Sequence, residues 1–203
     1  MASYGTEAGR DLEDKVRQTV AFIEATTGLR SRWNGTVRVV DATTASLLSP
    51  TPFFAKKEWG CGITLLETTL GNDGLWRSLL HEALHSVSVG LTEQSYQQFA
   101  PWEEAVVEGL QRILRPEFSL HLGIVLDESR LEGVEAIWRY NSAVEAVQRI
   151  ARERPEMSLQ EFLEQMLGTR LPDRPAFAFE WGRQCADFQR FKRVYAAASG
   201  NLR

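Results

Sequence analysis

Residues 75–89 read LWRSLLHEALHSVSV, and the interpretation of the whole chain starts from this stretch. The tripeptide NDG at 72–74 precedes it, and Asp73 is well suited to cap a helix. On that helix His81 and His85 are four residues apart, so both imidazoles leave the same face, while apolar residues on the other face dock on the core. The stretch therefore predicts an amphipathic helix with a pair of histidines on one side.

Two neutral imidazoles one helical turn apart chelate zinc, and Glu82 beside them can reach a metal-bound water without being a ligand. A third ligand is expected in PWEEAVVEGLQRILRP at 101–116, where Glu104 and Glu108 share a helix face opposite apolar residues. Glu103 is the competing ligand, but it lies about 100° around the helix from Glu104 and so off the face that Glu104 and Glu108 share. The alternative is that both polar faces are simply solvated.

HExxH followed by eighteen residues and a glutamate resembles the gluzincin branch of the zincin metallopeptidases, as in aminopeptidase N-like and thermolysin-like enzymes. The resemblance covers the chain from His81 to about Glu108. It implies that His81, His85 and Glu104 bind one Zn²⁺ per chain. It also implies that Glu82 is the general base, and that Glu108 hydrogen-bonds to a ligand histidine and fixes its tautomer.

The same resemblance implies that an extended peptide binds along an edge strand just before the helix of the two histidines. In this chain that strand is expected at Gly60 to Thr68, where Gly60 and Gly62 flank Cys61 and would let a substrate backbone approach closely. The alternative is a strand that begins with a bulge.

Zincins often use a tyrosine or a histidine to donate a hydrogen bond to the oxyanion that forms during cleavage. Tyr140 is the first candidate for this catalytic role, because it is expected on a long helix that can pack over the site, although a core tyrosine is the alternative. Tyr96, expected in the loop between the two metal-binding helices, is the second candidate. His121 is the third, with a surface histidine as its alternative.

Outside this region the sequence predicts further helices, two strands and one loop. The helices are expected at Leu12–Ile23 with a cap at Gly28, at Pro101–Leu114 stopped by Pro116, at Leu131–Glu153, at Leu159–Leu167 behind a Ser158/Glu161 capping box, and at Ala176–Ala198. The strands are expected at Thr36–Ala42 and Cys61–Thr69, with a loop formed by SPTPFF and KKE between them.

This order predicts an α+β fold in one zincin-like domain over 1–203. Its expected parts are a sheet-containing part at 1–72, metal-site helices at 73–115 and a helical part at 116–203. The formal charge of −4 disfavours binding to nucleic acid or membranes through bulk charge, although aromatic and basic residues alternate near the C-terminus. Two distant cysteines and the lack of a signal-like N-terminus favour a reducing cytosol.

The function predicted from these observations is zinc-dependent hydrolysis of peptide bonds. Two alternatives come from other classes of protein. One is a non-catalytic zincin-like module that zinc stabilises for a structural or binding role. The other is a regulator that binds nucleic acid through the C-terminal helices.

Overall fold

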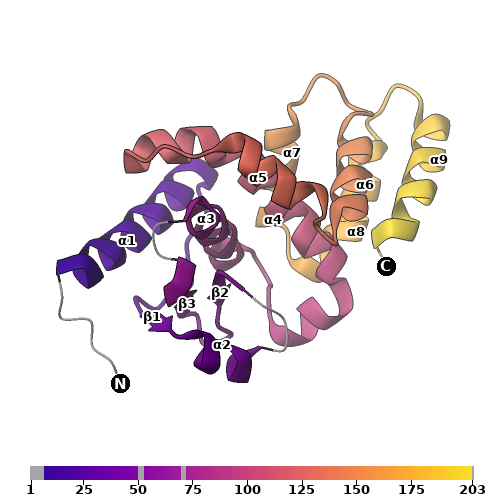
Figure 1. Cartoon of the computed structure of the whole chain (residues 1–203). Coiled ribbons are helices and arrows are strands. Elements are labelled where there is room, and N and C mark those ends of the chain that lie inside the picture. Colours follow the sequence, from indigo (N-terminus) through magenta and orange to yellow (C-terminus); the bar gives the residue numbers. More distant parts are fainter. Residues whose placement is uncertain (1–6, 50–52, 70–71, 203) are drawn as a thin grey trace. The chain divides into compact units, whose positions relative to one another are not determined.

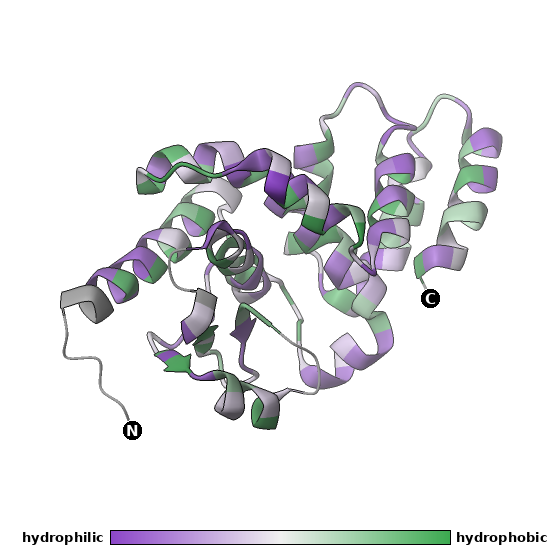
Figure 2. Cartoon of the chain, in the orientation of Figure 1, coloured by the Kyte–Doolittle hydropathy of each residue, from purple (hydrophilic) through white to green (hydrophobic). Residues whose placement is uncertain are grey.

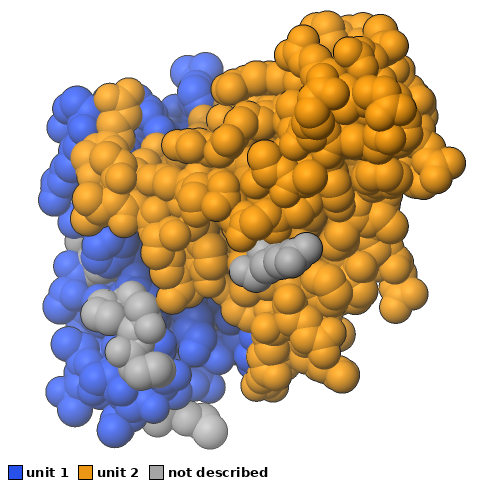
Figure 3. Space-filling view, turned by 90° about the vertical axis from the view of Figure 1, so that its right-hand side faces the viewer, with its two compact units in different colours: residues 1–87, 114–131 blue, residues 88–113, 132–203 orange. Residues whose placement is uncertain are grey.

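The computed structural model describes residues 7–49, 53–69 and 72–202. These residues form two compact units, unit 1 within 1–87 and 114–131 and unit 2 within 88–113 and 132–203 (Figure 3). The division does not test the expected single domain, which stays a prediction.

Unit 1 begins with α1 (Glu7–Thr27), the helix that the apolar periodicity predicts. Val16 and Val20 are buried, and Figure 2 shows hydrophobic and hydrophilic residues alternating around this helix. The helix ends at Gly28, whose φ of +68° lies in the left-handed region. Glycine adopts this conformation without strain, which confirms the predicted cap.

Three strands, β1 (Val37–Val40), β2 (Ala55–Lys57) and β3 (Ile63–Leu66), form a mixed sheet in the order β1-β3-β2. β1 runs parallel to β3, and β2 runs antiparallel to it. β3 is therefore the central strand of the sheet that the structure describes. Its residues Ile63 and Leu65 are buried, as a central strand requires.

A short helix, α2 (Ala42–Leu48), follows β1, so the strand predicted to reach Ala42 ends at Val40 instead. The side chain of Asp41 accepts a hydrogen bond from the backbone N–H of Thr44 at 2.6 Å. This bond satisfies an N–H of the first turn that would otherwise lack a helical partner, which favours a helix at this point.

β2 lies where the sequence predicts a loop, so that prediction is wrong for its two lysines. Lysine is common on edge strands, where its charge discourages pairing with other chains. The predicted SPTPFF part of the loop includes residues 50–52, which are outside the described residues. The predicted strand at Cys61–Thr69 is shorter in the structure, because β3 is followed by a 3₁₀ turn at Glu67–Thr69.

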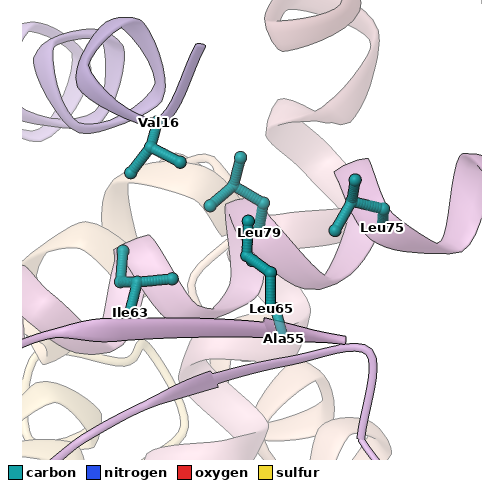
Figure 4. Close-up of a cluster of buried hydrophobic side chains, with 6 residues drawn as sticks. All are labelled: Val16, Ala55, Ile63, Leu65, Leu75 and Leu79. Carbon is teal, nitrogen blue, oxygen red and sulfur yellow. The ribbon is translucent and has the colours of Figure 1, made fainter. Parts of the chain in front are cut away.

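The core of unit 1 forms where α3 (Asp73–Val87) lies against the sheet (Figure 1). Buried side chains from α1, α3, β2 and β3 make one hydrophobic cluster, shown in Figure 4: Val16, Ala55, Ile63, Leu65, Leu75 and Leu79. Burial of each large side chain contributes about 1.5–3 kcal/mol. The cluster therefore fixes which face of α3 meets the sheet, and with it the direction of the polar face.

Asn72, rather than the predicted Asp73, caps α3. The side-chain oxygen of Asn72 accepts a hydrogen bond from Gly74 N at 2.9 Å, and its carbonyl accepts one from Leu75 N at 2.9 Å. Asp73 is the first helical residue, where its charge is favourable at the positive end of the helix dipole.

α4 (Glu93–Leu122) extends beyond the predicted helix at both ends. The predicted start at Pro101 corresponds to a kink, because Phe99 has non-helical φ and ψ of −128° and 22°. Pro116 does not stop the helix as predicted. Phe118 beyond it is fully buried against α1, and this burial offsets the backbone hydrogen bond that proline removes.

The helices that follow α4 are α5 (Glu128–Ala136), α6 (Asn141–Ala151), α7 (Leu159–Gly168), α8 (Arg174–Gly182) and α9 (Phe188–Ser199). Short 3₁₀ turns occur at Leu171–Asp173 and Gly200–Leu202. α7 confirms the predicted helix and its capping box, in which Ser158 Oγ accepts from Glu161 N at 3.1 Å and the Glu161 carboxylate accepts from Ser158 N at 2.8 Å.

The single helix predicted at 131–153 is wrong, because a turn separates α5 from α6. The side-chain amide of Asn141 donates to the backbone oxygens of Glu135 at 2.7 Å and Ala136 at 3.2 Å. These bonds satisfy the last carbonyls of α5 and so end the helix. Ile137 lies in this turn and is 86% exposed.

The single helix predicted at 176–198 is also wrong, since α8 and α9 are separate helices. α8 ends at Gly182, where an added Cβ would lie 2.0 Å from the ring of Phe191 on α9. Phe191 is fully buried and stacks on Phe188, with ring centroids 6.1 Å apart. The aromatic residues thus form a core face, and this packing needs a glycine at the end of α8.

The predicted α+β fold is confirmed, since the chain is mostly helical with one small mixed sheet near its N-terminus. Among the helices that the structure describes, none is long and apolar enough to cross a membrane.

Candidate metal centre

His81 and His85 face each other one turn apart on α3, within unit 1. They are only 5% and 6% exposed, and their Nε2 atoms are 3.1 Å apart. The rings are nearly perpendicular, with an interplanar angle of 80°. His81 is two residues, or about 200°, around the helix from Leu79, so the pair is on the side away from the sheet cluster.

This separation fits two ligands of one ion. In tetrahedral zinc sites with Zn–N distances of about 2.0–2.1 Å, ligand nitrogens are about 3.3 Å apart. The observed 3.1 Å is close to that value. It also fits a hydrogen bond in which one neutral ring donates to the other.

Glu82 is half-buried beside this pair, and its Oε2 atom accepts a hydrogen bond from the backbone N–H of Lys57 at 2.7 Å. The direction of that N–H follows from the register of β2. Leu66 N donates to Phe54 O, and Glu58 N donates to Gly62 O. The backbone N–H and C=O groups of every second residue in this segment therefore point toward β3. Lys57 lies between them and directs its N–H to the outer edge of the sheet. Glu82 therefore lies at the outer edge of β2.

The prediction that Gly60, Cys61 and Gly62 belong to a substrate-binding edge strand is wrong. They lead into β3, which is the central strand. Cys61 has φ of +66°, and its N–H donates to Glu58 O at 2.8 Å. These residues therefore form a tight turn between β2 and β3, and the strand with an outer edge next to Glu82 is β2.

Glu104 lies on α4 within unit 2 and is 5% exposed. The hydroxyl of Tyr96 donates to Glu104 Oε1 at 2.5 Å. Tyr96 is on the first part of α4, before the kink at Phe99, and not in a loop as predicted. The short hydrogen bond fixes the orientation of the Glu104 carboxylate.

Burial raises the pKa of Tyr96 above its ordinary value of 10.0, and the charge and hydrogen bond of Glu104 raise it further. Tyr140 adds to this effect. Tyr96 therefore stays protonated at neutral pH and acts as a donor. Tyr140 is half-buried at the start of α6 instead of within one long helix.

Glu108 is fully buried on α4, one turn after Glu104, as its spacing predicts. Its Oε1 atom accepts a hydrogen bond from Arg112 Nε at 2.9 Å. The predicted contact with a ligand histidine would join unit 2 to unit 1, and it stays a prediction.

Glu103, the competing ligand, is bound elsewhere in unit 2. Its Oε2 atom lies 2.7 Å from Arg174 Nη1, and both side chains are fully buried. Ser88 Oγ also donates to this carboxylate at 2.8 Å. The charge of Glu103 is therefore balanced by Arg174, which favours Glu104 as the ligand on α4.

His121 is exposed on the last turn of α4, within unit 1, and its ring lies 5.3 Å from that of Phe22. This location supports the alternative of a surface histidine. The sequence analysis missed the roles of Lys57, Arg112 and Arg174, because no spacing pattern links them to the acids that they contact.

Neither protein-family models, nor curated proteins, nor solved structures gave a match to this chain. The functional argument therefore depends on the residues and geometry of the chain itself.

Glu103→Ala should lower the free energy of unfolding in urea by about 3–5 kcal/mol, because it leaves the buried Arg174 charge without its carboxylate. Glu180→Ala is the matched control, since its ion pair with Arg183 is more than half exposed and contributes at most about 1 kcal/mol. Equal losses in the two variants would contradict this role of Glu103.

Proposed function

We propose that the protein is a zinc-dependent metallopeptidase whose single Zn²⁺ is held by His81, His85 and Glu104. The observation that carries the proposal is the pair of buried imidazoles with Nε2 atoms 3.1 Å apart, next to Glu82. Glu104, a buried carboxylate on α4, would complete the site as the third ligand. Two imidazoles and one carboxylate are a ligand set of catalytic zinc, which keeps a further position open.

Glu82 is suited to be the general base. A bound zinc ion would supply the Lewis acidity that makes water nucleophilic at neutral pH. Glu82 would take the proton of the attacking water and return it to the departing amine. The hydrogen bond from Lys57 N orients the carboxylate for both transfers.

The substrate would be an extended peptide paired with the outer edge of β2. This strand pairs with β3 on its other side, and Lys57 directs its N–H outward to Glu82. Main-chain pairing along such an edge binds a peptide without fixing its sequence. In this proposal the substrate pairs with β2 instead of residues 60–62. This pairing would bring the scissile amide near Glu82.

Tyr96 is the better candidate for the oxyanion donor. It is protonated, and its hydroxyl already donates to a carboxylate oxygen of the proposed ligand Glu104. Tyr140, the first candidate from the sequence, would act through Tyr96, whose pKa it raises.

The second candidate function is a zinc-stabilised structural or interaction module. The hydrogen bond between Lys57 and Glu82 favours it, since this bond gives Glu82 a structural role that needs no catalysis. The aromatic packing of α8 on α9 supports a core role for those residues instead of nucleic-acid binding. The two free cysteines agree with the proposed reducing cytosol.

Glu82→Gln should bind as much zinc as the wild type but cleave peptides at least about 100-fold more slowly, because the amide cannot accept the proton. The substrate is a peptide mixture from a digested proteome, with new termini counted by mass spectrometry. Glu58→Gln is the control, since Glu58 accepts a hydrogen bond from Thr64 away from α3. Cleavage by Glu82→Gln at the wild-type rate would favour the module and reject the catalytic mechanism.

Tyr96→Phe, assayed on the same mixture with saturating zinc, should lose about 100- to 1,000-fold in kcat, the usual effect of removing one oxyanion donor. Tyr195→Phe removes a hydroxyl that donates to Pro175 O at 2.8 Å and should leave kcat unchanged. A kcat for Tyr96→Phe equal to that of Tyr195→Phe would exclude Tyr96 as the donor.

A further inference from the structure

Unit 2 contains a cavity of about 280 Å³ that is lined by residues of α4, α5 and α6. Every residue of the lining belongs to this unit. The lining combines an arginine, glutamates, side-chain amides and aliphatic groups. Sites for drug-sized ligands usually have volumes of about 300–1,000 Å³, so this cavity suits a smaller molecule.

Arg112 is the basic residue of the lining, and its side chain is 27% exposed. Its Nε atom donates to Glu108 Oε1 at 2.9 Å, and its Nη2 atom donates to Asn141 Oδ1 at 2.9 Å. These two atoms share one edge of the guanidinium. The Nη1 atom lies on the other side, and among the residues that the structure describes it makes no hydrogen bond or ion pair. Its N–H groups are therefore available to a ligand.

The acids next to Arg112 leave this side of the guanidinium open. Glu135 Oε2 lies 3.6 Å from Nε, the same atom that donates to Glu108. Both carboxylates are therefore closest to the Nε edge, where they hold the guanidinium in place. A ligand carboxylate that accepts from Nη1 would bind on the side away from them, and pairs of this kind are among the stronger hydrogen bonds in proteins.

The rest of the lining offers negative charge and aliphatic surface. Glu132 on α5 and Glu145 on α6 are exposed carboxylates. Arg149 lies 3.7 Å from Glu145, but this pair is exposed and therefore weak in water. Ala136 and Val144 are the aliphatic residues of the lining. The cavity thus has groups for an anion, for a cation and for a small apolar side chain.

We propose that this cavity binds a free amino acid with an aliphatic side chain, in its zwitterionic form. The carboxylate would accept hydrogen bonds from Arg112, and the ammonium group would contact Glu132 and Glu145. The side chain would lie against Ala136 and Val144. A zwitterion meets opposite charge at both ends in such a lining, whereas a simple anion or cation meets it at one end only. The inference goes beyond the proposed function, because it needs no metal.

The alternative is a hydrated hollow whose polar groups only hold α4, α5 and α6 together. The two roles differ in what they require of a solute. A binding site for a zwitterion needs both charged ends of its ligand, while a hydrated hollow does not discriminate between solutes that have or lack them.

The test adds L-valine to the isotope-labelled full chain and follows the backbone amide signals by NMR, which measures weak binding and locates it. Saturating shifts are expected at the cavity residues of α6, around Val144 and Glu145. L-valinamide lacks the carboxylate and N-acetyl-L-valine lacks the ammonium group. Each should bind at least about 10-fold more weakly than L-valine, because each loses its hydrogen bonds to one charged side of the cavity.

Variants of the lining test the same contacts from the side of the protein. The double variant Glu132→Gln/Glu145→Gln changes exposed residues and should raise the Kd for L-valine about 10-fold. Glu180→Gln removes an exposed carboxylate of α8 that does not line the cavity, and it should keep the wild-type Kd. Arg112→Lys keeps the positive charge but lacks Nη1, so it should weaken L-valine by a similar factor. If Arg112→Lys does not fold, the glutamate variants decide.

Three results would overturn the inference. The first is no saturable shift with L-valine, glycine, L-alanine or L-leucine. The second is equal binding of L-valine, L-valinamide and N-acetyl-L-valine, since the charged ends would then play no part. The third is a Kd for the double glutamate variant equal to that of Glu180→Gln. A chain that binds no zinc would reject the proposed function and leave these expectations unchanged.

Discussion

The packing of α3 on the sheet is the contact on which unit 1 depends. Leu75 and Leu79 are buried against β2 and β3, so the opposite side of α3 has to carry the polar residues. The helical repeat then brings His81 and His85 together and sets Glu82 next to the outer edge of β2. The same hydrophobic contact thus stabilises the unit and determines the geometry of the candidate site.

Unit 2 depends on a different constraint, which is the cost of burying charge. α4 carries three buried glutamates within two turns, and an isolated carboxylate in such a place is strongly unfavourable. Each has a partner in its own unit: Arg174 for Glu103, Tyr96 for Glu104 and Arg112 for Glu108. The partner of Glu104 described here is a neutral hydroxyl, whereas Glu103 and Glu108 each contact an arginine.

Local sequence patterns predicted the features that depend on local physics. The spacing of His81 and His85, the cap at Gly28 and the capping box before α7 were all correct, because each is determined within one or two helical turns. Several predictions about elements that depend on tertiary contacts were wrong. The helix continues past Pro116 because Phe118 is buried beyond it, and β2 forms from charged residues because β3 offers it a partner. The role of Arg174 likewise comes from a contact between residues 71 positions apart, which no spacing pattern contains.

The central claim is that His81, His85 and Glu104 bind one zinc ion, and metal content tests it most directly. Protein purified without added metal would be analysed by inductively coupled plasma mass spectrometry, as the wild type and as Glu104→Ala. About one zinc per wild-type chain, with a sharp loss in Glu104→Ala, is the result expected for a three-ligand site. A wild-type protein without metal, even after zinc is supplied, would contradict the claim and reduce the histidine pair to a hydrogen bond between two buried rings.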